Sequence, residues 1–125
     1  MKTALFALLL SISSFAFADD KFANITQAEL EAAIKAKTVV VIDVNGSDSF
    51  KAGHIPTAVD FEAQSKAIAK VLPADKTALV VAYCGSESCP AWKSAATAVA
   101  ALGYTNVKHF TPGLSGWKGE LQKQN

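Results

Sequence analysis

The chain contains no arginine, although it carries 12 basic residues, all of them lysines. The planar guanidinium of arginine is the usual group for binding sulfonate or phosphate oxygens in pairs. Any anion site in this protein must therefore use lysine side chains or backbone N–H groups.

An excess of charge of either sign is also missing. The formal net charge is +1, from 12 basic and 11 acidic residues, so nothing favours nucleic acid or an anionic membrane as a partner. Long polar tracts are absent too, and 50% of the residues are hydrophobic. The composition predicts one globular domain.

The first residues have the composition of an export signal. Lys2 provides a positive start, an apolar run follows over 4–10, and a pattern of small residues ends at Ala18. We expect residues 1–18 to be a secretory signal peptide, and residues 19–125 to be the mature domain, exported to a bacterial periplasm. The run is short for a membrane span, so no membrane association is expected after cleavage. An uncleaved N-terminal anchor is the alternative.

Cysteine is scarce, and both cysteines lie in the predicted mature part. Cys84 and Cys89 are five positions apart, and in an oxidising compartment such a pair can form a disulfide. A loop this short contributes less stability than a long-range bridge, so the pair suits chemistry better than structural cross-linking. Two cysteines without a neighbouring histidine do not complete a tetrahedral metal site, and we predict neither a metal nor a cofactor.

Helical and strand patterns alternate along the mature chain. Apolar, β-branched runs predict strands at 38–44, 58–61, 77–83 and 106–110. Capping and periodicity predict helices at 26–36, 47–51, 64–71, 90–102 and 114–121. This alternation predicts an α/β fold with a mostly parallel sheet and helices on both faces.

Cys84 directly follows a predicted strand and precedes a predicted helix. The small residues Gly85, Ser86 and Ser88 let the backbone curl around the sulfur, and a curl of N–H groups together with a helix start favours thiolate. Glu87 acts in the opposite direction, because a nearby carboxylate disfavours a second negative charge. Taken alone, this position also fits a buried and inert cysteine.

Four parts of the chain resemble the rhodanese-like domain, in the family's order and spacing. They are the strand at 40–44, the turn at 52–58, the strand that ends in the cysteine at 80–84, and the closing segments 103–107 and 112–117. The resemblance covers nearly all of residues 19–125. It implies a three-layer α/β/α fold with about five strands.

The resemblance also implies a sulfurtransferase or sulfur carrier in which Cys84 is the catalytic nucleophile. Cys84 would take a sulfane sulfur from a small donor as a persulfide and pass it to a thiophilic acceptor or a partner-protein thiol. The implied substrate-binding residues are Gly85, Ser86, Glu87, Ser88, Cys89 and Lys93. The implied supporting residues are Asp43, His54 and Trp117.

The loop departs from the family pattern at its end. Cys89 occupies the position where a basic residue is usual, and Asn45 stands where the first strand is usually followed by arginine. Two other functions therefore stay open. One is a thiol/disulfide redox protein in which Cys84 attacks and Cys89 resolves. The other is a binding module that keeps the fold without catalysis. A phosphatase of similar fold is disfavoured, since it needs an arginine in this loop.

Overall fold

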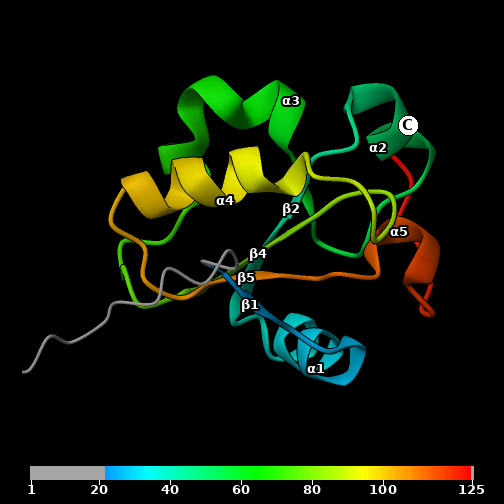
Figure 1. Cartoon of the computed structure of the whole chain (residues 1–125), viewed down its shortest axis with the longest axis horizontal. Coiled ribbons are helices and arrows are strands. Elements are labelled where there is room, and N and C mark those ends of the chain that lie inside the picture. The colour runs from blue at the N-terminus through cyan, green and yellow to red at the C-terminus, as the bar shows by residue number, and fades with distance from the viewer. Residues whose placement is uncertain (1–21, 125) are drawn as a thin grey trace, which may run out of the picture.

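The computed structural model of the chain describes residues 22–124 (Figure 1). The predicted signal peptide lies outside the described residues. Five strands form one sheet: β1 (Ala23–Asn24), β2 (Val39–Asp43), β3 (Val59–Asp60), β4 (Leu79–Tyr83) and β5 (Val107–His109). The helices are α1 (Gln27–Ala36), α2 (Ser47–Ala52), α3 (Phe61–Gln64), the 3-10 helix η1 (Ser65–Val71), α4 (Trp92–Ala101) and α5 (Gly113–Gly116).

The sheet has the order β1-β5-β4-β2-β3, and all of its strand pairs are parallel. This confirms the predicted α/β class and the five-stranded, parallel sheet. β4 lies in the middle, with Ala82 opposite Ile42 of β2 and opposite His109 of β5. Ligands bind beyond the carboxyl ends of the strands in such sheets. The carboxyl end of β4 is therefore the middle one of these strand ends.

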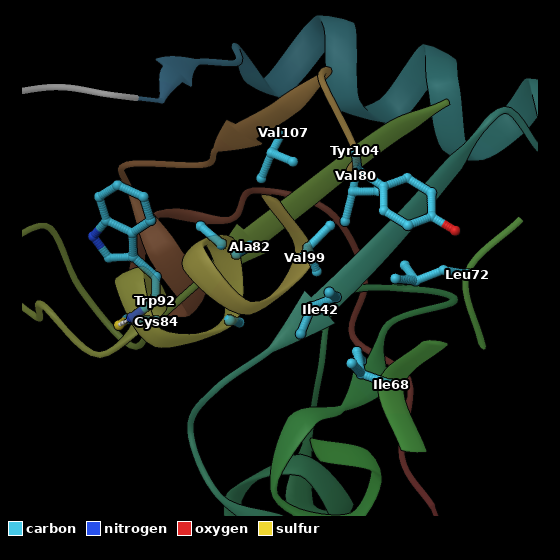
Figure 2. Packing of buried hydrophobic residues seen from close by; sticks show 12 residues of the cluster. Ile42, Ile68, Leu72, Val80, Ala82, Cys84, Trp92, Val99, Tyr104 and Val107 are labelled. Carbon is cyan, nitrogen blue, oxygen red and sulfur yellow. Dashed lines mark hydrogen bonds between the residues drawn. The ribbon is translucent and has the colours of Figure 1, made fainter. Parts of the chain in front are cut away.

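Two apolar clusters cover the two faces of the sheet. Helix α1 lies below the sheet in Figure 1, while α3 and α4 lie above it. On the α1 side, Leu30 packs in a cluster with Val41 and Phe110. On the α4 side, Val99 packs in a cluster with Val80 and Ile42 (Figure 2). Successive side chains of the buried strands point alternately into the two clusters. Because both faces are covered, the sequences of those strands are continuously apolar.

Helix α1 begins as its sequence predicts. Thr26 is the N-cap: its hydroxyl accepts a hydrogen bond from the amide of Glu29, and the Glu29 carboxylate accepts one from the amide of Thr26. This capping box satisfies two amides that have no partner within the helix. The helix ends at Ala36, and its C-cap residue, Lys37, has left-handed backbone angles.

The predicted helix at 64–71 is present at 65–71, but it is a 3-10 helix, and the helical segment starts earlier than predicted. Asp60 accepts a hydrogen bond from the amide of Ala63, and this cap starts the short helix α3 at Phe61. The chain then continues as the 3-10 helix η1, with non-helical angles at Ala67. The Asp60 cap thus starts the helical segment at Phe61, three residues before the predicted start.

The last predicted helix is shorter than expected, because α5 ends at Gly116. Beyond it, Gln122 pairs with His54: each amide donates to the other's carbonyl oxygen at 2.9 Å. Backbone groups that a longer helix would have satisfied are satisfied by a distant segment instead.

Helix α4 is shorter than the predicted helix at 90–102, and four residues form its buried face. The residues that face the core are Trp92, Ala95, Ala96 and Val99, whereas Leu102 is 39% exposed. The helix begins two residues after Pro90 rather than at it. Among residues 22–124, no helix has the length and apolar character required to cross a bilayer.

Candidate active site

Cys84 lies one residue beyond the carboxyl end of β4, as the sequence predicts. Its side chain is fully buried within the α4-side cluster. Its sulfur accepts a hydrogen bond of 3.0 Å from the backbone amide of Trp92, the first residue of α4 (Figure 2). The amides of a helix's first turn carry partial positive charge, so this contact stabilises negative charge on the Cys84 sulfur.

Cys84 and Cys89 form a disulfide whose Cα atoms are 5.9 Å apart. The intervening loop turns back on itself, and the Cys89 amide donates to the Ser86 carbonyl oxygen at 3.3 Å. Cys89 is only half-buried, in contrast to Cys84. The two cysteines of one bond therefore have different environments: Cys84 is enclosed beneath a helix start, and Cys89 is partly exposed at the edge of the same cluster.

The start of α5 packs directly against the cysteine loop. The amide of Leu114 donates to the Cys84 carbonyl oxygen at 2.8 Å, and that of Ser115 donates to the Gly85 carbonyl oxygen at 2.9 Å. Gly113 has a φ of +66°, and a Cβ atom there would lie 2.7 Å from the Cys84 carbonyl oxygen. A glycine is needed at this position for both its backbone angle and its small size.

A pocket of about 330 Å³ opens beside Cys89. It is lined by Phe22, Asn24, Glu87, Ser88, Cys89, Pro90, Trp92, Lys93, His109 and Thr111. The structure thus brings together four of the predicted substrate-binding residues. Ser86 instead lines a second pocket, on the α5 side of the loop, together with Ser115 and Lys118.

The wall of the Cys89 pocket includes residues that sequence reasoning left without a role. The rings of Trp92 and His109 stack in parallel, with centroids 3.6 Å apart, and Phe22 meets Trp92 edge-on at 5.9 Å. These residues come from α4, β5 and the segment before β1. The packing of α4 on β5 and the pairing of β1 with β5 bring them together, so the sequence held no local signal for this wall.

Asp43 is buried at the carboxyl end of β2, opposite Tyr83, the residue before Cys84. Its carboxylate accepts a hydrogen bond of 2.5 Å from the Tyr83 hydroxyl and one of 2.7 Å from the amide of Asn45. Burial raises the pKa of Asp43, although these hydrogen bonds act to lower it. Burial and the neighbouring Asp43 carboxylate both raise the pKa of Tyr83 above its ordinary value.

His54 lies in a turn that a hydrogen bond ties to Tyr83. The Tyr83 hydroxyl accepts a hydrogen bond of 3.0 Å from the amide of Ile55, and so ties the turn to the residue before Cys84. His54 is buried, its ring stacks on Phe50, and its Nδ1 atom lies 2.7 Å from the Phe50 carbonyl oxygen. The hydrogen bonds of Asp43 and His54 thus run to Tyr83, Asn45 and Phe50 rather than to the Cys84 sulfur.

Trp117 lies on the opposite side of the sheet from the Cys84 side chain. Its ring meets Phe110 edge-on in the α1-side cluster, and its Nε1 atom donates to the Glu120 carbonyl oxygen at 3.1 Å. It anchors the chain after α5. Over residues 22–124, no group of three or more histidine, cysteine, aspartate or glutamate side chains is arranged to hold a metal ion.

The geometry defines a parallel α/β domain with a cysteine loop between its central strand and a helix start. The family model for the rhodanese-like domain matches residues 26–120, and the chain belongs to that family. No curated protein matches the chain in sequence.

Solved structures share the fold. A protein from Bacillus halodurans is 25% identical, with a TM-score of 0.64 and coverage of 81% of this chain and 77% of that one. The 3-mercaptopyruvate sulfotransferase SseA from Escherichia coli is 18% identical, with a TM-score of 0.67 and coverage of 83% and 51%. A thiosulfate sulfurtransferase from Pseudomonas aeruginosa is 18% identical, with a TM-score of 0.64 and coverage of 83% and 21%.

Proposed function

We propose that the reduced protein is a sulfurtransferase or sulfur carrier that uses Cys84 as its nucleophile. The Cys84 thiolate attacks the outer sulfur of a small sulfane donor, the donor's sulfur bond breaks, and the remainder of the donor leaves as an anion. The sulfur stays on Cys84 as a persulfide. A thiophilic acceptor, such as cyanide or a partner-protein thiol, then attacks the terminal sulfur and restores the thiolate.

One observation carries this proposal: the Trp92 amide donates a hydrogen bond to the Cys84 sulfur at the start of α4. The contact stabilises the thiolate before attack and again after the sulfur has been passed on. Two relatives in fold are named for sulfur transfer, which supports the same chemistry. The backbone of residues 85–89 would hold the persulfide charge, and Lys93 would attract an anionic donor.

The disulfide favours a second candidate, a thiol/disulfide redox protein. In that function Cys84 and Cys89 exchange two electrons with a partner dithiol. Export to an oxidising periplasm, which we propose from the N-terminal segment, is consistent with such a role. The two candidates differ in what is left on the protein: an added sulfur in the first, and a disulfide alone in the second.

Intact mass spectrometry separates these candidates. The protein is reduced, freed of reductant and incubated with thiosulfate. We expect the mass of one added sulfur, which the acceptor cyanide then removes. Cys84→Ser should abolish the addition, whereas Cys89→Ser should retain it. Loading that persists in Cys84→Ser and disappears in Cys89→Ser would contradict the assignment of the nucleophile.

A further inference from the structure

We propose that the Cys84–Cys89 disulfide is a lock on sulfur transfer, opened by an external thiol that attacks the Cys89 sulfur from the neighbouring pocket. The inference rests on the proposed function, in that Cys84 is taken as the sulfur-transfer residue. It specifies the direction in which the bond opens and the face of the protein from which the reductant arrives. In the oxidised protein Cys84 has no thiolate to offer, and it is enclosed.

The two cysteines differ in their exposure to solvent. Cys84 has an exposed fraction of 0%, whereas Cys89 is partly exposed and lines the 330 Å³ pocket. A thiolate must approach a disulfide sulfur directly to displace the other sulfur. In the oxidised protein Cys89 packs at the edge of the α4-side cluster and borders the pocket, while Cys84 lies within that cluster with Cys89 bonded to its sulfur. A sulfur donor then reaches Cys84 only after the bond has opened and Cys89 has moved away from it.

The leaving sulfur is stabilised at the same time. When a thiolate attacks Cys89, the bonding electron pair passes to Cys84, which must accept negative charge. The Trp92 amide is already 3.0 Å from the Cys84 sulfur and donates a hydrogen bond to it. A more stable leaving thiolate departs faster, so this contact favours opening in the same direction as access does.

The exchange balances in two steps. The first external thiolate forms a mixed disulfide with Cys89 and releases Cys84 as a thiolate. A second external thiolate attacks the external sulfur of that mixed disulfide and releases the Cys89 thiolate, which takes a proton from water. Two external thiols are oxidised to one disulfide, the protein gains two electrons, and Cys84 is left ready for a sulfur donor.

The pocket also bears on the charge of the incoming thiol. Lys93 lines it and is exposed, with its ammonium 5.9 Å from the centre of the Trp92 ring. A positive charge beside the point of attack raises the local concentration of an anionic thiolate at low ionic strength. Glu87 is on the same rim, so Lys93 offsets a repulsive charge there.

The direction of opening can be read from the first adduct. The oxidised protein is mixed with glutathione, quenched early with acid and N-ethylmaleimide, and cleaved after Glu87, which separates the two cysteines. We expect glutathione on the peptide with Cys89 and N-ethylmaleimide on the peptide with Cys84. Glutathione found mainly on Cys84 would overturn the proposal. So would isolation of the unreduced protein with both thiols open to alkylation.

A charge reversal tests the route. Lys93→Glu should slow reduction by glutathione about threefold to tenfold at low ionic strength, and a neutral thiol should be much less affected. Lys118→Glu is the matched control, because Lys118 is an exposed lysine that lines the pocket on the α5 side of the loop. Equal slowing by the two substitutions would exclude approach through the Cys89 pocket.

Two thiol sources share this chemistry, a small thiol and a dithiol protein. A reduced thioredoxin whose second cysteine is replaced by serine serves as the protein probe, and its mixed disulfide is mapped as above. An adduct on Cys89 from either probe supports the proposal, and the faster probe indicates the source. The proposed function fails separately, since sulfur loading is measured on protein that has already been reduced chemically.

Discussion

At the residue scale, the Tyr83 hydroxyl connects three parts of the site. It donates to Asp43 on β2 and accepts from Ile55 in the turn after α2, and it belongs to the residue directly before Cys84. All three groups are buried, so their hydrogen bonds are strong and costly to leave unmade. The hydroxyl thereby positions the end of β4.

Tyr83→Phe removes this hydroxyl and leaves a buried carboxylate and a buried amide each short of one partner. We expect a loss of about 2–4 kcal/mol in the free energy of unfolding, measured with urea. Tyr104→Phe is the control, because its hydroxyl makes a single bond, to the Pro73 carbonyl oxygen. It should cost about 1 kcal/mol. Equal losses would show that Tyr83 has no special linking role.

Asp43 gives stability a pH dependence of defined sign. Burial raises its pKa in the folded protein above the ordinary 3.8, so the folded state binds this proton more tightly than the unfolded state. Its contribution to stability is then greatest below pH 3.8 and falls as the pH rises through the raised pKa. The measurement is the unfolding free energy of the wild type minus that of Asp43→Asn at a series of pH values.

That difference should decrease with rising pH and then level off. The hydrogen bond from Tyr83 acts to lower the pKa of Asp43, so removing it in a Tyr83→Phe background should move the decrease to higher pH. A difference that grows with pH would show that hydrogen bonding outweighs burial at this carboxyl.

At the element scale, the start of α5 is hydrogen-bonded to the cysteine loop. Two amides from this helix hold the carbonyl oxygens of Cys84 and Gly85, and Gly113 allows the two backbones to touch. The loop therefore depends on an element about thirty residues further along the chain. Its shape is not set by its own small residues alone.

Gly113→Ala tests this contact. Alanine at φ +66° is strained, and its Cβ atom would collide with the backbone of the cysteine loop. Gly103→Ala is the control, because φ is +97° there and the space around the new atom is open. We expect Gly113→Ala to lower the free energy of unfolding by about 2 kcal/mol more than Gly103→Ala does. Equal losses would mean that backbone strain alone matters.

At the scale of the whole molecule, stability comes from the sheet and its two apolar clusters rather than from the disulfide. The clusters contain most of the buried side chains, and all five strands pair without help from the cysteines. The disulfide closes a loop with a sequence separation of 5. A bridge this local removes little entropy from the unfolded chain.

Reduction should therefore leave the fold intact. We expect the free energy of unfolding to fall by about 2 kcal/mol or less, with a single cooperative transition in both redox states. Urea unfolding followed by tryptophan fluorescence, with and without reductant, measures this, and Cys89→Ser should match the reduced wild type. Loss of cooperative unfolding on reduction would show that the bridge is structural.

Much of the fold could be predicted because its signals are local. The capping box at Thr26, the apolar runs of β2 and β4, and the glycine after α4 each act within a few residues. The predictions failed where a distant contact decided the outcome. The chain after Gly116 pairs with His54 rather than continuing as a helix, and β1 exists only because β5 is there to pair with it.

The sequence by itself determined the α/β class, the family motifs and the position of Cys84 after a buried strand, since these depend on residue order and short-range periodicity. Only the tertiary structure decided that Cys84 is enclosed while Cys89 borders a pocket, and that α4 directs its first amide at the Cys84 sulfur. Burial and hydrogen-bond geometry depend on how β1, β5, α4 and α5 pack around the loop. No window of neighbouring residues contains that information.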